Sequence, residues 1–347
     1  MNGSKNIILK MNNFEFFPVG HGLFYFGSID SKNFNFVYDC GTESSVNISN
    51  YIDLLHDYLD DRDLDFVVLS HLHIDHFSGL QHLLKTIHVK KLYLPYLGNT
   101  WILKTTLLTM SIIYSINSID NIDLILRYLN IAKSIYEREE ASFIIDDNSS
   151  KSSFSVASFD EHEWIFKFFS KSYPLAKINL LGIKINAYLK TNSFVGVEDA
   201  IKNGKIQDIK LIYESIFGKN NQLNKTSICL LHYPKKGSRI IFRRGVVGLK
   251  TYYHPGEGVT FLTGDAMITK KELLEMNIDK TIDVFQVPHH GSKSNWKNVS
   301  SLIYCDAVLS CSNLRRHRLP NKDVIKSIDF DKYNECNESS DFLYTIY

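Results

Sequence analysis

One short segment, Ser-His-Leu-His-Ile-Asp-His at residues 70–76, constrains this chain more than any other. It follows the apolar run DFVVLS, which predicts a buried strand that ends directly at the histidines. Alternate residues leaving a strand point the same way, so His71 and His73 can bind one cation. Asp75 and His76 lie where the chain turns and can face a second cation. Imidazole nitrogen and carboxylate oxygen suit Zn²⁺, and also Mn²⁺ or Fe²⁺.

Two later segments supply the side chains that such a cluster lacks. One apolar run ends at Asp265 (FLTGD), and another ends at the adjacent pair His289 and His290 (VPHHGS). An Asp after a strand is usually a turn residue or a helix cap. After the histidine cluster, however, a bridging carboxylate and a further histidine are the missing ligands of a two-metal site.

The order HLHIDH, FLTGD, VPHHGS resembles the metallo-β-lactamase superfamily. More narrowly, the chain is similar to the hydrolase domain of the ComEC competence-channel family. That family carries a V-G-Q-G turn, a D-C-G strand end, an N-x-x-S strand start and a late H-P-x-P segment. The similar segments here are VGHG, YDCG, NKTS and HRLP, which begin at Val19, Tyr38, Asn224 and His317.

The resemblance implies two divalent metal ions, Zn²⁺ or Mn²⁺, and a role for each matching residue. The metal ligands would be His71, His73, Asp75, His76, Asp265 and His289. The catalytic residues would be Asp75, His290, Asp39, which orients a ligand histidine, and His317, a general acid. Substrate would contact Asn224, Ser292, Arg315 and Arg316. The choice between His289 and His290 as the ligand stays open.

Three positions depart from the pattern of the family. Asn224 stands where many superfamily members have a third histidine for the first metal, and it leaves that metal more open. His21 replaces the usual Gln of the early turn, and Arg318 interrupts the late His-Pro pair.

The order of elements predicts an α/β fold, a four-layer αβ/βα metallo-β-lactamase sandwich with two central sheets and helices outside. Residues 1–96 and 223–347 would form the hydrolase domain, and residues 97–222 a large, mostly helical insertion or lid subdomain. Within it, Ser152–Ala157, Glu163–Ser170 and Ile178–Ala187 look like strands. This insertion could also contact a protein partner or a second copy of the chain.

Composition limits how the chain could meet its partners. The formal net charge of +1 argues against binding nucleic acid by overall basicity. A basic hairpin that includes Lys235 and Lys236 would contact phosphates only if it lined the metal cleft, and such runs are usually solvated. Five scattered cysteines without a CxxC pair, no signal peptide and no membrane segment predict a cytoplasmic protein.

These features predict a dinuclear metal-dependent hydrolase, a nuclease or phosphodiesterase that cleaves DNA or RNA by attack of a metal-bridging hydroxide. Two alternatives remain open. The same metals could hydrolyse a small lactone, thioester or amide under a lid formed by the insertion. The chain could instead be a non-catalytic binding module that retains the fold, although the complete ligand set argues against this.

Overall fold

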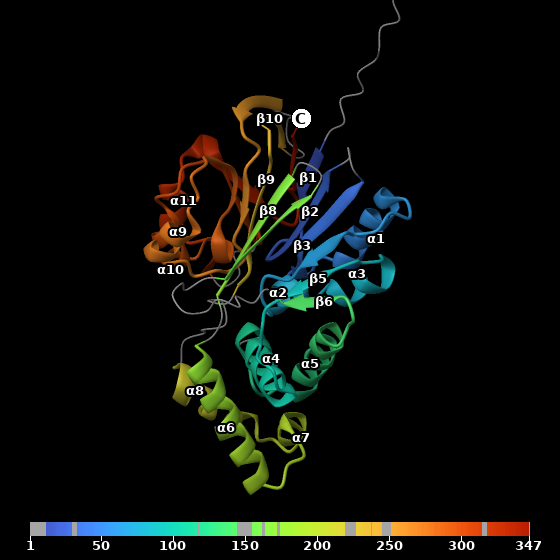
Figure 1. Ribbon diagram of the computed structural model, residues 1–347, viewed down its shortest axis with the longest axis vertical. Coiled ribbons are helices and arrows are strands. Elements are labelled where there is room, and N and C mark those ends of the chain that lie inside the picture. The colour runs from blue at the N-terminus through green and yellow to red at the C-terminus, as the bar shows by residue number, and fades with distance from the viewer. Residues whose placement is uncertain are drawn as a thin grey trace, which may run out of the picture.

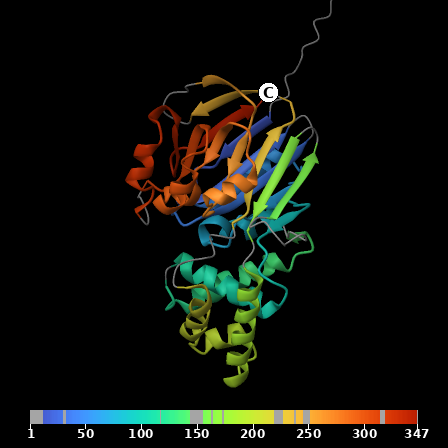
Figure 2. The ribbon, with the colours of Figure 1, turned by 60° about the vertical axis from the view of Figure 1, so that its left-hand side comes forward.

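Two β-sheets packed face to face form one part of the molecule, and a group of helices extends from one end of this sandwich (Figures 1 and 2). The structure is a computed structural model. It describes residues 12–29, 33–116, 118–143, 155–161, 164–171, 174–218, 227–236, 238–244, 251–313 and 318–346.

The first sheet has nine strands among the described residues. Their order is β11 (Thr251–Gly256), β10 (Ser238–Arg244), β16 (Phe342–Ile346), β1 (Asn12–Phe16), β2 (Gly22–Ile29), β3 (Phe34–Thr42), β4 (Phe66–Val68), β5 (Leu92–Leu94) and β6 (Ala141–Phe143). The strands from β11 to β3 pair antiparallel, and those from β3 to β6 pair parallel.

The second sheet has seven described strands. Their order is β15 (Tyr333–Cys336), β14 (Tyr304–Ser310), β13 (Ile282–Gln286), β12 (Thr260–Leu262), β9 (Cys229–Pro234), β8 (Trp164–Ser170) and β7 (Ser155–Glu161). The four strands from β15 to β12 are parallel. Parallel strands present their carboxyl ends at the same edge of a sheet, which is where α/β proteins place their functional groups.

Aromatic side chains fill the space between the sheets. Phe36 and Phe66 of the first sheet meet Phe166 of the second edge to face, with ring centroids 5.2 and 5.3 Å apart. All three rings are almost fully buried. Burial of each such ring contributes about 2 to 3 kcal/mol, so this layer holds the sheets together.

Helices cover the outer face of each sheet, as the four-layer prediction requires. The first sheet carries α1 (Ile48–Leu59) and α3 (Leu80–Thr86), and the second carries α9 (Lys270–Met276), α10 (Lys293–Val299) and α11 (Lys322–Ser327). In α1, Asn47 caps the first turn by accepting from the backbone N–H of Ser49. The buried residues of this helix, Ile48, Ile52, Leu55 and Leu59, recur at helical spacing and form its sheet-facing stripe. The predicted fold class is confirmed.

The helical group comprises α4 (Trp101–Ile116), α5 (Ile122–Tyr136), α6 (Leu175–Thr191), α7 (Val197–Lys202) and α8 (Ile206–Phe217). The strand predicted at Ile178–Ala187 is wrong, because these residues lie inside α6. Leu180 and Ile183 are exposed there and fill the gaps of the buried helical stripe. Because these exposed residues are also apolar, the segment has a continuous apolar run, which is typical of a buried strand.

Three described strands within residues 97–222 belong to the two sheets of the sandwich. Strand β8 confirms the strand predicted at Glu163–Ser170, and β7 overlaps the end of the strand predicted at Ser152–Ala157, whose first three residues lie outside the described residues. Both strands extend the second sheet beside β9. In the same way, β6 adds to the first sheet beside β5. The chain therefore passes between the helical part and the sandwich at several points. The domain boundaries stay a prediction. None of the described helices combines the length and the hydropathy that crossing a membrane requires.

Candidate metal centre

Six of the predicted or alternative site residues converge at one edge of the sandwich. Side-chain donor atoms of Asp75, His76, Asp265 and His290 lie within 4.8 Å of one another, and so do those of His71, His73 and Asp265. The two groups share Asp265. We refer to these six residues, His71, His73, Asp75, His76, Asp265 and His290, as the His/Asp centre.

Three strand ends deliver the side chains of the His/Asp centre. The loop after β4 carries the first two histidines and leads into the single-turn helix α2 (Ile74–Phe77), which carries Asp75 and His76. Asp265 follows β12, and His290 lies in the turn after β13. Strand β3 passes so close to α2 that a Cβ atom added at Gly41 would lie 2.4 Å from the backbone of His76. Only glycine permits this approach.

The two carboxylate oxygens of Asp265 face different sets of histidines. Its Oδ2 lies 3.5 Å from Nε2 of His71, and its Oδ1 lies 3.2 Å from Nε2 of His76 and 3.8 Å from Nε2 of His290. Nε2 of His290 also lies 2.7 Å from Oδ2 of Asp75. A carboxylate that presents one oxygen to each donor group has the arrangement needed to bridge two cations.

Each of three histidines is held through Nδ1, so that its Nε2 atom points into the centre. Nδ1 of His76 lies 2.7 Å from the carboxylate of Asp39, and Nδ1 of His290 lies 2.6 Å from the carbonyl oxygen of Ser310. Nδ1 of His71 lies 3.0 Å from the hydroxyl of Ser70. Such partners keep a proton on Nδ1, so that Nε2 is the atom that each of these imidazoles can offer to a metal when it is neutral.

Asp39 holds both the ring of His76 and the residue Ser70 in place. Its carboxylate also accepts hydrogen bonds from the backbone N–H of Ser70 at 2.6 Å and from the Ser70 hydroxyl at 2.7 Å. Asp39 has a positive φ of 57°, at the point where the β2–β3 register shifts. A non-glycine residue in this region costs about 1 to 3 kcal/mol, and such strain persists where the surroundings hold it in place. The predicted orienting role of Asp39 fits this geometry.

Buried charges in the centre balance one another. Burial lowers the pKa of His73 to about 3 and also lowers the pKa of His71, so both imidazoles are neutral at pH 7. Burial works to lower the pKa of His76, but the carboxylates around it, Asp75 first, raise this pKa well above its usual value. Burial works to raise the pKa of Asp265, and the surrounding imidazoles hold it well below its usual range.

The residues present fit divalent cations. Within the described part of the chain, Nε2 of His71 and Nε2 of His76 are buried and make no hydrogen bond, although each faces Asp265. A buried polar atom without a partner costs about 1 to 3 kcal/mol unless something binds it. Several imidazole nitrogens and two carboxylates are the donor set that Zn²⁺ or Mn²⁺ takes. The chemistry of the donors, not only their spacing, thus favours metal.

The remaining predicted residues divide into two groups. Asn224, Arg315, Arg316 and His317 lie outside the described residues. Ser292 is half-buried at the start of α10 and follows the histidine pair directly. His289 lies beside the centre, 3.5 Å from Oδ2 of Asp265, whereas His290 falls within the ligand group that includes Asp75 and His76. Geometry thus favours the alternative, His290, over His289 for that group.

Two contacts around the site could not be predicted from the sequence. The His21 ring is buried and lies over the His290 ring with centroids 4.2 Å apart. The backbone N–H of Ile74, at the start of α2, donates to the hydroxyl of Ser115 at the end of α4. That contact joins positions 41 residues apart, and nothing in a serine on an apolar helix predicts it.

The basic turn at Lys235 and Lys236 does not reach the centre. It follows β9, which runs antiparallel to β12, with Leu230 opposite Leu262 and His232 opposite Thr260. Strand β12 runs towards Asp265, so β9 runs away from it and ends at the opposite edge of the sheet. These lysines therefore supply no phosphate contact at the His/Asp centre.

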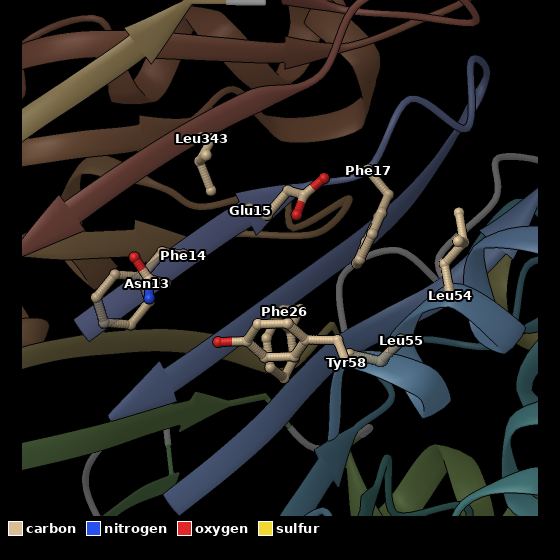
Figure 3. Close-up of a pocket in the computed structure, with 9 residues that line it drawn as sticks. All are labelled: Asn13, Phe14, Glu15, Phe17, Phe26, Leu54, Leu55, Tyr58 and Leu343. Carbon is tan, nitrogen blue, oxygen red and sulfur yellow. The ribbon is translucent and has the colours of Figure 1, made fainter. Parts of the chain in front are cut away.

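A second concave site lies elsewhere, between α1 and strands β1 and β16. This pocket of about 350 Å³ is lined by Asn13, Phe14, Glu15, Phe17, Phe26, Leu54, Leu55, Tyr58 and Leu343 (Figure 3). Burial, with a smaller contribution from Asp341, raises the pKa of Glu15 from 4.5 to about 7. The pocket has no histidine among its lining residues and is separate from the metal centre.

Residues 27–113 match the family model described as the metallo-beta-lactamase superfamily. The matched residues run from β2 to α4 and include His71, His73, Asp75 and His76, and the two-sheet architecture agrees with the predicted metallo-β-lactamase fold. The narrower resemblance to the ComEC family stays a prediction.

No curated protein matches the chain. Among solved structures, 27 chains match, and one of them is a long form RNase Z from yeast. That structure is 12% identical to this chain with a TM-score of 0.39, and the match covers 98% of this chain and 43% of the other. The chain thus spans less than half the length of that enzyme. A likeness of this size does not establish a shared activity.

Proposed function

We propose that this protein is a dinuclear metal-dependent hydrolase. The observation that carries the proposal is the pair of donor groups that share Asp265, one with His71 and His73 and the other with Asp75, His76 and His290. When bound there, two divalent cations would activate a water molecule and stabilise the negative charge that builds on the attacked group. A binding module that has lost its chemistry has no need to keep such a complete and buried donor set.

The chain's own residues have separable tasks in this proposal. His71 and His73 would hold the first ion, and Asp75, His76 and His290 the second, with Asp265 between them. Asp39 would act as a positioning residue, because it holds the ring of His76 through Nδ1 at 2.7 Å. The neutral state of His71 and His73 suits this task, because a protonated imidazole cannot bind a metal.

For the substrate, we propose a phosphodiester of DNA or RNA. The support is the order of the motifs, which resembles the ComEC hydrolase domain, with Ser292 beside the histidine pair. The net charge of +1 and the remote position of Lys235 and Lys236 restrict the contacts with phosphate to the immediate surroundings of the metals.

The test is a substrate panel with the full chain and added Mn²⁺ or Zn²⁺. Single-stranded and duplex DNA, RNA and a simple phosphodiester are compared with lactone, thioester and amide substrates. We expect metal-dependent cleavage of at least one nucleic acid and none of it in His73→Ala. Cleavage of a lactone, thioester or amide alone would retain the metal-dependent hydrolase and remove the phosphodiester. A chain that binds no metal under any of these conditions would overturn the whole proposal.

A further inference from the structure

The adjacent histidines His289 and His290 lie on a backbone that few residues adopt. Their φ angles are both 50°, and φ of Gly291 is 80°, so three successive residues are left-handed. Only glycine adopts this conformation readily, and two histidines in a row hold it only where their surroundings impose it. The result is a tight turn that sends the two imidazoles in different directions, with ring centroids 6.2 Å apart and planes 73° apart.

The two rings approach opposite oxygens of the same carboxylate. Nε2 of His289 lies 3.5 Å from Oδ2 of Asp265, the oxygen that His71 also faces at 3.5 Å. Nε2 of His290 lies 3.8 Å from Oδ1, the oxygen that His76 faces at 3.2 Å. Each histidine of the pair therefore shares an oxygen of Asp265 with a histidine from a different half of the His/Asp centre.

His289 is also held in the same way as the ligand histidines. Its Nδ1 lies 3.4 Å from Oδ1 of Asn295, a residue that is 1% exposed. The amide nitrogen of Asn295 donates to the backbone carbonyls of Asp265 and Ala266, at 3.1 and 3.2 Å. Those two bonds fix the amide so that its oxygen faces His289, and this oxygen can only accept. When Nδ1 of His289 donates to this oxygen, the Nε2 lone pair faces the centre.

The first donor group has room for such a ligand. It offers two histidines and one oxygen of Asp265, three donors for an ion with four or five coordination positions, so a fourth protein ligand and a water molecule can both bind. The side chain of His289 is 33% exposed, whereas that of His290 is 2% exposed, so the two rings differ in their access to solvent.

We infer that the pair divides between the two ions: His289 binds the ion held by His71 and His73, and His290 binds the ion held by Asp75 and His76. This inference rests on the proposed function, because it assigns a further ligand within the same metal centre. Two neighbours in the sequence then tie the two ions to one turn of the chain.

The experiment measures Zn²⁺ binding to the full chain without any substrate, by equilibrium dialysis and elemental analysis. The wild-type chain is expected to hold two ions. We expect His289→Ala to lower the affinity for one of the two ions by at least about tenfold. Removing a residue that only supports a metal ligand already lowers the affinity by about 10- to 100-fold, so the loss of a ligand should cost at least as much. His289→Asn is the second variant, because asparagine tolerates a positive φ and keeps the turn intact. His82→Ala is the matched control, since His82 lies on the surface and bonds Asp53.

Two backgrounds identify which ion is affected. His73→Ala disables the first group, and adding His289→Ala should leave the affinity of the remaining ion unchanged. His76→Ala disables the second group, and adding His289→Ala should weaken the remaining ion by at least about tenfold. The same additions of His290→Ala should give the opposite pattern.

Two results would overturn the inference. One is unchanged affinity for both ions in His289→Ala and His289→Asn, and the other is a weaker remaining ion when His289→Ala is added to His73→Ala. A wild-type chain that binds no Zn²⁺ would overturn the metal centre itself and this inference with it. A chain that binds two ions in the expected pattern but cleaves nothing would remove only the proposed activity.

Discussion

The carboxylates of the His/Asp centre and the carboxylate of Glu15 are all buried, but the side chains around them differ in charge. Imidazoles surround Asp265 and hold its pKa well below the usual range although burial works the other way. Around Glu15 the pocket is mostly apolar, and burial, with a smaller contribution from the carboxylate of Asp341, raises the pKa to about 7. Burial alone therefore does not mark a metal site. The sign and the chemistry of the neighbours decide whether a buried acid stays an anion and can hold a cation.

The largest effect should follow from removing the shared carboxylate. Asp265→Asn deletes the one charge that faces both donor groups, so we expect the loss of both ions and a fall in hydrolysis of at least about 10³-fold. Elemental analysis and a rate assay measure the two losses. Heat denaturation in the presence of a chelator, where neither chain holds metal, checks that the variant still folds.

A smaller loss should follow from removing the support of a ligand. Asp39→Asn keeps the shape of the side chain but weakens its hold on the His76 ring, and we expect a 10- to 100-fold lower metal affinity. Dialysis against a graded chelator measures it. An unchanged affinity would mean that the ring of His76 is oriented by its packing alone.

Substitution of Glu15 should stabilise the protein, in contrast to the losses expected from the changes at Asp265 and Asp39. Its pKa of about 7 in the folded chain lies above the value of 4.5 expected when unfolded, so the folded chain binds more protons between these values. The contribution of Glu15 to the free energy of unfolding is therefore fully present below pH 4.5, where the side chain is protonated, and is lost as the pH rises through 7. Glu15→Gln, which carries no charge at any pH, should be more stable than the wild type at pH 8 by about 1 to 3 kcal/mol.

Denaturant unfolding at pH 4 and at pH 8 tests this prediction, because the difference should vanish at the lower pH. Metal affinity should not change, since the pocket of Glu15 is separate from the His/Asp centre. Asp341→Asn is the control for the smaller cause of the shift and should reproduce a fraction of the gain. Equal stability of Glu15→Gln and wild type at pH 8 would show that Glu15 is better solvated than its burial implies.

The smallest effect concerns the link between α4 and the metal loop. Ser115→Ala removes the hydroxyl that accepts from the backbone N–H of Ile74, and we expect a loss of about 1 kcal/mol in stability. A matched change at Ser134, which bonds only within α5, should cost less. If the two variants unfold alike, the hydroxyl of Ser115 does not stabilise the start of α2.

The sequence predicted the parts of the site that lie at strand ends. The apolar runs before residues 71, 265 and 289 predict buried strands, and the histidine cluster makes the polar residues at their ends candidate metal ligands. It could not separate His289 from His290, because that distinction depends on a left-handed turn that no pattern of apolar residues reveals. The partners that hold the rings, Ser310 and Asn295, are ordinary polar residues far from the histidines along the chain or in a different element.

The fold class could also be predicted from the sequence, and the errors in the predicted secondary structure have related causes. Alternation and spacing identified the two halves of the sandwich, but the stripe of α6 was hidden by exposed apolar residues such as Leu180 and Ile183. The addition of β7 and β8 to the second sheet is a matter of long-range pairing. Periodicity describes which face of a segment is buried and says nothing about which strand lies beside it.

The contact between Ser115 and Ile74 makes the helical region part of the scaffold of the metal loop. The Ser115 hydroxyl also lies 3.1 Å from the carboxylate of Glu43, just beyond β3, so a single side chain ties α4 to two neighbouring segments. A shortened chain made by excising α4–α8 would leave the first turn of α2 without its cap. We therefore expect such a shortened chain to bind metal more weakly than the full chain.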